Sequence, residues 1–162
     1  MNYKMIFILI LNFFFLNTEN NTQNSKFNLK ERKSLTEIIE AHKGKVIYLD
    51  FWASWCKPCR KEIIKMKKIK EELKHKSISF IYISLDLDKT QCDNAVKKDG
   101  IIVENYLISN LLNDTGIEEL NKIRTIPHYI IFDKEGKLVN ANAPSPSQKN
   151  KLIEQLNKYL KE

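Results

Sequence analysis

Cysteine is scarce in this chain of 162 residues, where it occurs only as Cys56, Cys59 and Cys92. Exported domains that rely on disulfides for stability carry several cysteine pairs, so three cysteines exclude a stapled framework. The sequence also lacks a second close Cys pair or a His pair that would complete a closed tetrahedral zinc site. The pair Cys56 and Cys59 therefore needs a chemical explanation.

The sequence contains no apolar run of the ~20 residues that cross a bilayer comfortably. Its N-terminal apolar stretch, residues 5–16, follows Lys4 and gives way to Asn, Thr, Gln and Ser. A cationic start before a short apolar stretch is typical of a secretory signal peptide. The sequence has no small-x-small motif that would mark a cleavage position. No Cys follows the apolar stretch to carry a lipid anchor. We expect residues 1–20 to be a signal peptide or N-terminal membrane anchor, and the protein to be exported, either periplasmic or anchored facing outside the cytoplasm.

Positive charge is in excess, with 27 Lys and Arg against 20 Asp and Glu, and nine of the cations lie in residues 57–76. Such a run could attract nucleic acid or anionic lipid. It has no interleaved aromatic residues, however, which makes it a weak nucleic-acid signal. We expect a solvated helix face, no nucleic-acid partner, and membrane contact only through the N-terminal segment.

Residues 21–30 are polar and predict a linker, which leaves residues 31–162 for one domain. Ser34 and Glu37 form a capping box that predicts a helix ending near Gly44. Residues 46–52 are almost all apolar and predict a central strand covered on both faces. Pro58 fits the first turn of a following helix.

The rest of the chain alternates strands and helices. Further strands are expected at 78–85, 129–133 and 137–140, with Gly136 in a hairpin between the last two. Helices are expected around 94–98, 106–112 and 115–123, and again from Ser145 onward. The order β-α-β-α-β-β-α predicts an α/β fold, with a mixed central β-sheet and helices on both faces.

Cys56 and Cys59 are separated by two residues at the start of the predicted helix, so the two sulfurs can form a small reversible disulfide. The helix dipole favours the Cys56 thiolate, and Lys57 and Arg60 add nearby cations. A thiolate at neutral pH can attack a substrate disulfide. The pattern thus indicates thiol-disulfide exchange.

Two other interpretations remain open for this pair. A structural disulfide would close a very small loop and would add little stability. Alternatively, Cys56, Cys59 and a third ligand such as His128 could hold zinc or Cu(I) in a metallochaperone.

Residues 51–60 (FWASWCKPCR) resemble the active-site segment of the thioredoxin superfamily, specifically the TlpA-like exported thiol-disulfide reductases. Residues 125–137 (TIPHYIIFDKEGK) resemble its second landmark, and residues 86–115 its helical insertion. The resemblance implies a thioredoxin-like fold, with Cys56 as the attacking and Cys59 as the resolving cysteine. It also implies a cis Ile126–Pro127 bond beside the dithiol, where the backbone pairs with an extended substrate.

Asp50 is a further catalytic candidate, because an acid inside an apolar central strand is costly unless it is used. In the family it lies beneath the dithiol, where burial would raise its pKa and suit it to take the proton from Cys59. The alternative is an Asp near a strand end that reaches water.

Several neighbouring residues are weaker candidates. Trp55 is expected to shield the substrate, with Trp52 packed beneath it, and Lys57 and Pro58 to tune the reduction potential. His128 is either a substrate-preference residue or an exposed strand residue. Cys92 is expected to be an ordinary buried thiol.

Together these features predict an extracytoplasmic thiol-disulfide oxidoreductase that reduces disulfides in protein substrates. It is expected to need no metal and no cofactor beyond the Cys56–Cys59 disulfide, and to be re-reduced by an upstream membrane thiol reductase. The alternatives are an oxidase or isomerase using the same site, or the metallochaperone.

Overall fold

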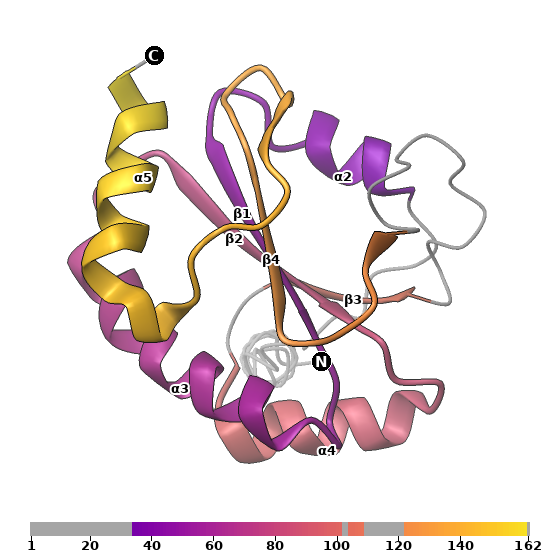
Figure 1. The fold of residues 1–162 in the computed structure, drawn as a ribbon. Helices are drawn as coiled ribbons and strands as arrows, with labels where there is room; N and C mark the ends of the chain where they lie inside the picture. The colour runs from indigo at the N-terminus through magenta and orange to yellow at the C-terminus, as the bar shows by residue number, and fades with distance from the viewer. Residues whose placement is uncertain (1–33, 102–103, 109–121, 162) are drawn as a thin grey trace, which may run out of the picture.

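The computed structural model of the chain describes residues 34–101, 104–108 and 122–161 (Figure 1). The predicted signal peptide or anchor, the polar linker and most of the helix expected at 115–123 lie outside these ranges. Within the described ranges, no helix has the length and apolar character needed to cross a membrane.

Strand β1 (Val46–Trp52) is the centre of the fold, and all seven of its residues are buried. It pairs in parallel with β2 (Ile78–Ser84) and antiparallel with β4 (His128–Phe132). Strand β3 (Glu104–Leu107) lies outside β2, and β5 (Leu138–Asn140) lies outside β4, in the order β3-β2-β1-β4-β5. The described residues therefore form the mixed sheet that the sequence predicted.

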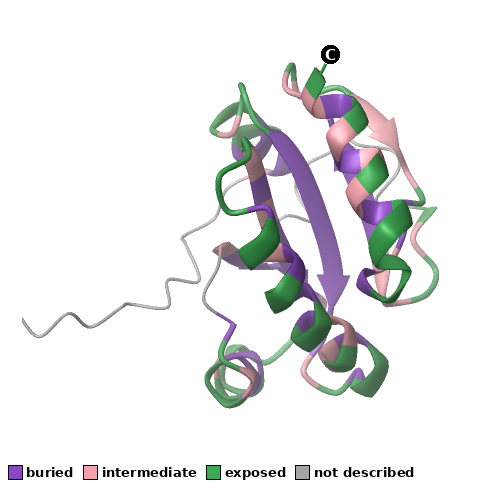
Figure 2. Ribbon diagram, turned by 90° about the vertical axis from the view of Figure 1, so that its left-hand side faces the viewer, coloured by how far each residue is buried: buried purple, intermediate pink, exposed green. Residues whose placement is uncertain are grey.

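Helices cover both faces of this sheet, as Figures 1 and 2 show. Helix α2 (Leu35–Glu40) packs on one face, against β1 residues such as Ile47 and Leu49. Helices α3 (Lys57–Glu72) and α5 (Lys149–Lys161) share a core with Val46 and Tyr48, which point to the other face because side chains alternate along a strand. Helix α4 (Lys89–Asp99) packs with the first turns of α3. The predicted α/β, thioredoxin-like layering is confirmed.

The local signals at several element ends are confirmed. Ser34 and Glu37 form both hydrogen bonds of the capping box of α2, although that helix ends at Glu40 rather than near Gly44. The hairpin between β4 and β5 places Gly136 at a φ of 81°, the left-handed conformation that glycine adopts without strain. Helix α5 is preceded by a short 3₁₀ turn, η3 (Pro146–Gln148).

The segment after β2 differs from the prediction. A helix was expected at 94–98, but α4 begins earlier, because the Asp88 side chain caps it by accepting a hydrogen bond from the Thr90 N–H. A helix was also expected at 106–112, yet Tyr106 and Leu107 belong to strand β3 and pair with the buried end of β2. The rest of that expected helix, residues 109–112, lies outside the described residues. The predicted helical insertion therefore contains a helix and an edge strand, because the β2 edge offers hydrogen bonds that local sequence patterns do not reveal.

Two adjacent isoleucines on α3 provide a matched test of this packing. Ile63 is 2% exposed beneath the helix, whereas Ile64 is 54% exposed on its outer side. We predict that Ile63→Ala lowers the free energy of unfolding by about 2–5 kcal/mol, because it leaves a cavity in the core. Ile64→Ala should change it by no more than about 0.5 kcal/mol. Urea titration of both variants measures the difference, and equal effects would contradict this placement of α3.

Candidate active site

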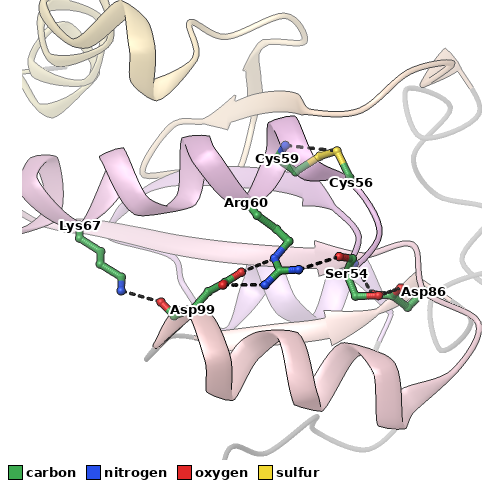
Figure 3. A network of polar contacts seen from close by, with 7 residues as sticks. All are labelled: Ser54, Cys56, Cys59, Arg60, Lys67, Asp86 and Asp99. Carbon is green, nitrogen blue, oxygen red and sulfur yellow. Dashed lines mark hydrogen bonds and ion pairs between the residues drawn. A yellow bond between two sulfur atoms is a disulfide. The ribbon is translucent and has the colours of Figure 1, made fainter.

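The two cysteines lie where β1 leads into α3. Strand β1 ends at Trp52, a short turn follows, and Cys56 is the N-cap residue of α3. Cys56 and Cys59 form a disulfide with their Cα atoms 5.3 Å apart, seen in Figure 3. Pro58 lies in the first turn, where its missing N–H breaks no helical hydrogen bond. The structure thus brings the predicted pair together at a helix N-terminus.

The sulfur of Cys56 accepts a hydrogen bond from the Cys59 backbone N–H at 3.2 Å. In the reduced protein the same N–H and the helix dipole would stabilise a thiolate on Cys56, because both direct positive charge toward that sulfur. Cys56 is 5% exposed, whereas Cys59 is fully buried. The less buried cysteine is therefore also the one whose thiolate the helix favours.

The expected neighbours of the dithiol are in place. The Ile126–Pro127 peptide bond is cis, and Ile126 packs against the buried cluster that contains Cys56 and Cys59. Trp55, in the turn before Cys56, is 64% exposed, whereas Trp52 is completely buried. An exposed indole thus precedes Cys56 in the turn, and the residue before the cis-proline packs against the cluster that contains both cysteines.

Of the two cations beside the dithiol, Arg60 has a different partner from the one expected. Lys57 is exposed at the first position of α3. Arg60, expected to add positive charge near the thiolate, instead forms a bidentate ion pair with Asp99, its Nε and Nη2 atoms lying 2.5 and 2.8 Å from the carboxylate oxygens. Figure 3 shows its side chain turned away from the disulfide. Because Asp99 neutralises this guanidinium, its contribution to the thiolate is smaller than the sequence suggested.

Asp50 is buried in β1 with 1% of its surface exposed, so the alternative that it reaches water is wrong. It points to the same face as Tyr48 and Trp52, which is the face covered by α3, the helix that carries Cys59. Neither of its carboxylate oxygens has a hydrogen-bond partner among the described residues. Burial raises the pKa of Asp50 well above its ordinary value, and the charge of Glu62 raises it further.

Three tyrosines surround this acid. Tyr82 and Tyr129 are its partners on the neighbouring strands, and Tyr48 precedes it by two residues on β1. Burial raises the pKa of all three hydroxyls, and the charge on Asp50 adds to the effect. The tyrosines therefore form a poorly solvated pocket that favours the protonated carboxyl group.

Comparison with known proteins shows which family the chain belongs to. Residues 44–138, more than half of the chain, match the family model described as thioredoxin-like. The chain belongs to the thioredoxin-like family. This membership confirms the resemblance to the thioredoxin superfamily.

Individual relatives of this thioredoxin-like chain point the same way. It is 35% identical over 126 residues to the thiol-disulfide oxidoreductase ResA of Bacillus thuringiensis subsp. konkukian, covering 76% of this chain and 66% of that relative, a little under two thirds of its length. A solution structure from Bacteroides vulgatus, of a protein assigned as a thiol-disulfide oxidoreductase, is 32% identical with a TM-score of 0.62, covering 76% of this chain and 78% of the other. The thioredoxin domain of a second thiol-disulfide oxidoreductase of that organism is 25% identical, with a TM-score of 0.60 and coverages of 75% and 83%.

Glu62 is a residue of this thioredoxin-like site that sequence reasoning missed. It accepts hydrogen bonds from the backbone N–H and hydroxyl of Ser147, and from the Lys65 ammonium at 2.8 Å. Burial opposes its ionisation, but these hydrogen bonds outweigh burial and lower the pKa of Glu62. Its position three residues after Cys59, on the same side of α3, is the sequence signal that could have revealed it.

The remaining candidates lie at the edge of the site or apart from its chemistry. His128 is half-buried at the start of β4, where burial lowers its pKa. Cys92 is completely buried, as expected, and accepts a hydrogen bond from Asn105 at 3.3 Å. Burial raises the pKa of its thiol, which makes it a poor nucleophile. Among the described residues, no group of three or more His, Cys, Asp or Glu side chains is arranged to hold a metal ion.

The raised pKa of Asp50 predicts how stability depends on pH. Between the unfolded pKa of about 3.9 and the higher folded value, the folded protein keeps a proton that the unfolded chain has lost. The free energy of unfolding should therefore fall across that window, by up to about 1.4 kcal/mol per pH unit from this group. Asp50→Asn should remove this fall and be the more stable protein at neutral pH. Chemical unfolding from pH 4 to 8 measures both, and parallel curves would contradict the assignment.

Glu62 should set part of that pH window. Glu62→Gln removes a negative charge near Asp50, so the upper end of the pH-dependent fall in stability should move to lower pH. Glu71→Gln, an exposed carboxylate on the same helix that pairs with Lys74, is the control and should leave the window unchanged. The same unfolding series measures the shift, and an unchanged window in Glu62→Gln would show that its charge does not reach Asp50.

Proposed function

We propose that this protein is an extracytoplasmic thiol-disulfide oxidoreductase that reduces disulfides in protein substrates through Cys56 and Cys59. The observation that carries the proposal is the Cys56–Cys59 disulfide at the start of α3, with the Cys56 sulfur accepting the Cys59 N–H. Two relatives with this fold are named thiol-disulfide oxidoreductases, which supports the same chemistry here.

In the reduced protein, the Cys56 thiolate attacks one sulfur of a substrate disulfide. The substrate S–S bond breaks, a mixed disulfide forms with Cys56, and the other substrate sulfur leaves as a thiolate that takes a proton from water. Cys56 performs this step because it is the less buried member of the pair and because the helix N-terminus stabilises its charge.

The second step releases the substrate. Cys59 loses its proton and its sulfur attacks the Cys56 sulfur, which breaks the mixed disulfide and expels the second substrate thiolate. Two electrons have then passed from the dithiol to the substrate, and the Cys56–Cys59 disulfide remains. The ionised form of Asp50 would accept the Cys59 proton, because its raised pKa makes this buried carboxylate, on the face beneath α3, a stronger base.

The rim of the dithiol suits a polypeptide substrate. Trp55 offers exposed apolar surface, and the Ile126–Pro127 loop adjoins the cluster that contains both cysteines. An extended segment lying between them would place its disulfide over Cys56, in line with the roles that the resemblance gives to Trp55, Ile126 and Pro127. Lys57 and Pro58, between the cysteines, would then adjust the reduction potential.

Export and the reducing direction are part of the proposal. The cationic start and the apolar stretch at residues 5–16 support export. Outside the cytoplasm a reductase needs an external source of electrons, so a membrane thiol reductase would return the disulfide to the dithiol.

Insulin reduction with a thiol donor tests this activity. Cys56→Ser should abolish it, and Cys59→Ser should accumulate the mixed disulfide. Asp50→Asn should slow turnover by roughly a hundredfold, as expected for loss of a positioned proton acceptor. The control Cys92→Ser should keep full activity, because that thiol is buried apart from the disulfide. Insulin reduction that survives in Cys56→Ser would sink the proposal, and tight one-to-one Cu(I) binding without turnover would favour the metallochaperone.

The reduction potential of the Cys56–Cys59 couple tests the direction. A value near or below ~−250 mV, measured against thioredoxin and glutathione buffers, supports a reductase. A value near ~−120 mV would instead indicate an oxidase.

A further inference from the structure

Ser54, two residues before Cys56, is held by charged side chains through all of its polar groups. Its backbone N–H and its hydroxyl donate to the two carboxylate oxygens of Asp86, at 2.9 and 2.7 Å. Its carbonyl oxygen accepts a hydrogen bond from Arg60 Nη1 at 3.3 Å. Figure 3 shows Asp86 and Arg60 reaching Ser54 from its two ends. We call these three residues, with Asp99, the Ser54 clamp.

The Asp86 side of the clamp is buried. Asp86 follows the end of β2 and is 2% exposed, and the Ser84 hydroxyl donates a third hydrogen bond to its carboxylate at 2.6 Å. Three donors to one buried carboxylate offset much of the cost of removing its charge from water. Asp86 therefore has a fixed carboxylate, to which the turn before Cys56 is hydrogen-bonded through Ser54.

The Arg60 side of the clamp ties the turn to two helices. Arg60 belongs to α3 and forms a bidentate pair with Asp99, at the end of α4. The Asp99 carbonyl accepts a hydrogen bond from Lys67 Nζ at 2.5 Å, which joins the end of α4 to α3 a second time. Because the guanidinium is planar, its two contacts with Asp99 aim the remaining Nη1 atom at the Ser54 carbonyl.

We propose that Asp86 and the Arg60–Asp99 pair are positioning residues that set the thiolate fraction of Cys56. The backbone of the turn contributes a hydrogen bond from the Cys56 N–H to the Ala53 carbonyl, and the clamp holds Ser54, one of the two residues between them. A fixed turn keeps Cys56 at the N-cap position, where its sulfur meets the Cys59 N–H. A loosened turn separates that sulfur from the N–H and raises the energy of the thiolate. This role rests on the proposed function, since it concerns the attacking cysteine.

Two substitutions of Arg60 distinguish the effect of its hydrogen-bonding geometry on Cys56 from the effect of its positive charge. Arg60→Gln removes the cation, whereas Arg60→Lys keeps it but has a single ammonium that cannot hold both Asp99 oxygens and the Ser54 carbonyl. The other ionisable groups named around the turn and α3 stay in both variants: Asp50 from β1, Lys57 and Glu62 from α3, Asp86 after β2, and Asp99 at the end of α4. An effect shared by the two variants therefore reports the lost geometry.

The experiment measures the rate at which iodoacetamide alkylates Cys56 in the reduced full-length chain, as a function of pH. Both Arg60 variants should move the midpoint to higher pH and slow alkylation at pH 7 by roughly three- to tenfold, the effect of weakening one hydrogen bond to a charged sulfur. Lys74→Gln is the control, because it breaks the exposed Lys74–Glu71 pair at the opposite end of α3 from Cys56, and it should behave as wild type.

Two outcomes in folded Arg60 variants would overturn the proposal. Wild-type midpoints in both folded Arg60 variants would show that the clamp does not position Cys56. A shift in Arg60→Gln with a wild-type midpoint in Arg60→Lys would assign the effect to charge. If neither variant folds, Ser54→Ala removes the hydroxyl bond to Asp86 alone, and it must raise the midpoint for the proposal to stand.

The insulin assay keeps the two proposals distinguishable. If wild-type protein fails to reduce insulin while the Arg60 variants still shift the alkylation midpoint, the proposed function fails and the positioning role stands.

Discussion

The start of helix α3 at the end of strand β1 is the constraint on which the rest of the site depends. Strand β1 is buried along its whole length, so its carboxyl end is fixed by the packing on both faces. The turn that follows carries Cys56 directly into the N-cap position, where its sulfur accepts the Cys59 N–H. The reactive sulfur is therefore placed at the end of a fully buried strand, and the helix N-terminus supplies electrostatic stabilisation of its thiolate.

Burial divides the residues around this helix into distinct roles. The same apolar layer that holds α3 on the sheet leaves Asp50 without a hydrogen-bond partner among the described residues, and so raises its pKa. Glu62, nearer the surface, remains ionised because Lys65 and Ser147 bind it. Two carboxylates on neighbouring elements thus have opposite protonation preferences, and a nearby anion strengthens the preference of the buried one for its proton.

Much of this arrangement could be predicted because the signals are local. The capping box at Ser34, the apolar run of β1, Pro58 after Cys56 and the hairpin at Gly136 each depend on a few adjacent residues, and the structure contains all four. Strand β3 and the early start of α4 were not predicted. Tyr106 and Leu107 are in a strand because the edge of β2 lies beside them, and no pattern within residues 104–107 carries that information.

The sequence by itself determined which residues could do chemistry: a Cys pair two residues apart, an acid inside an apolar strand, and a proline before a strand. These follow from residue type and spacing, which act over one or two turns of chain. Only the tertiary structure decided how charges are shared among them. Arg60 pairs with Asp99, 39 residues away, rather than with the dithiol. Asp86 holds Ser54 across 32 residues of chain. Such pairings depend on distances in space, because electrostatic interactions act between neighbours in the fold however far apart they are in the chain.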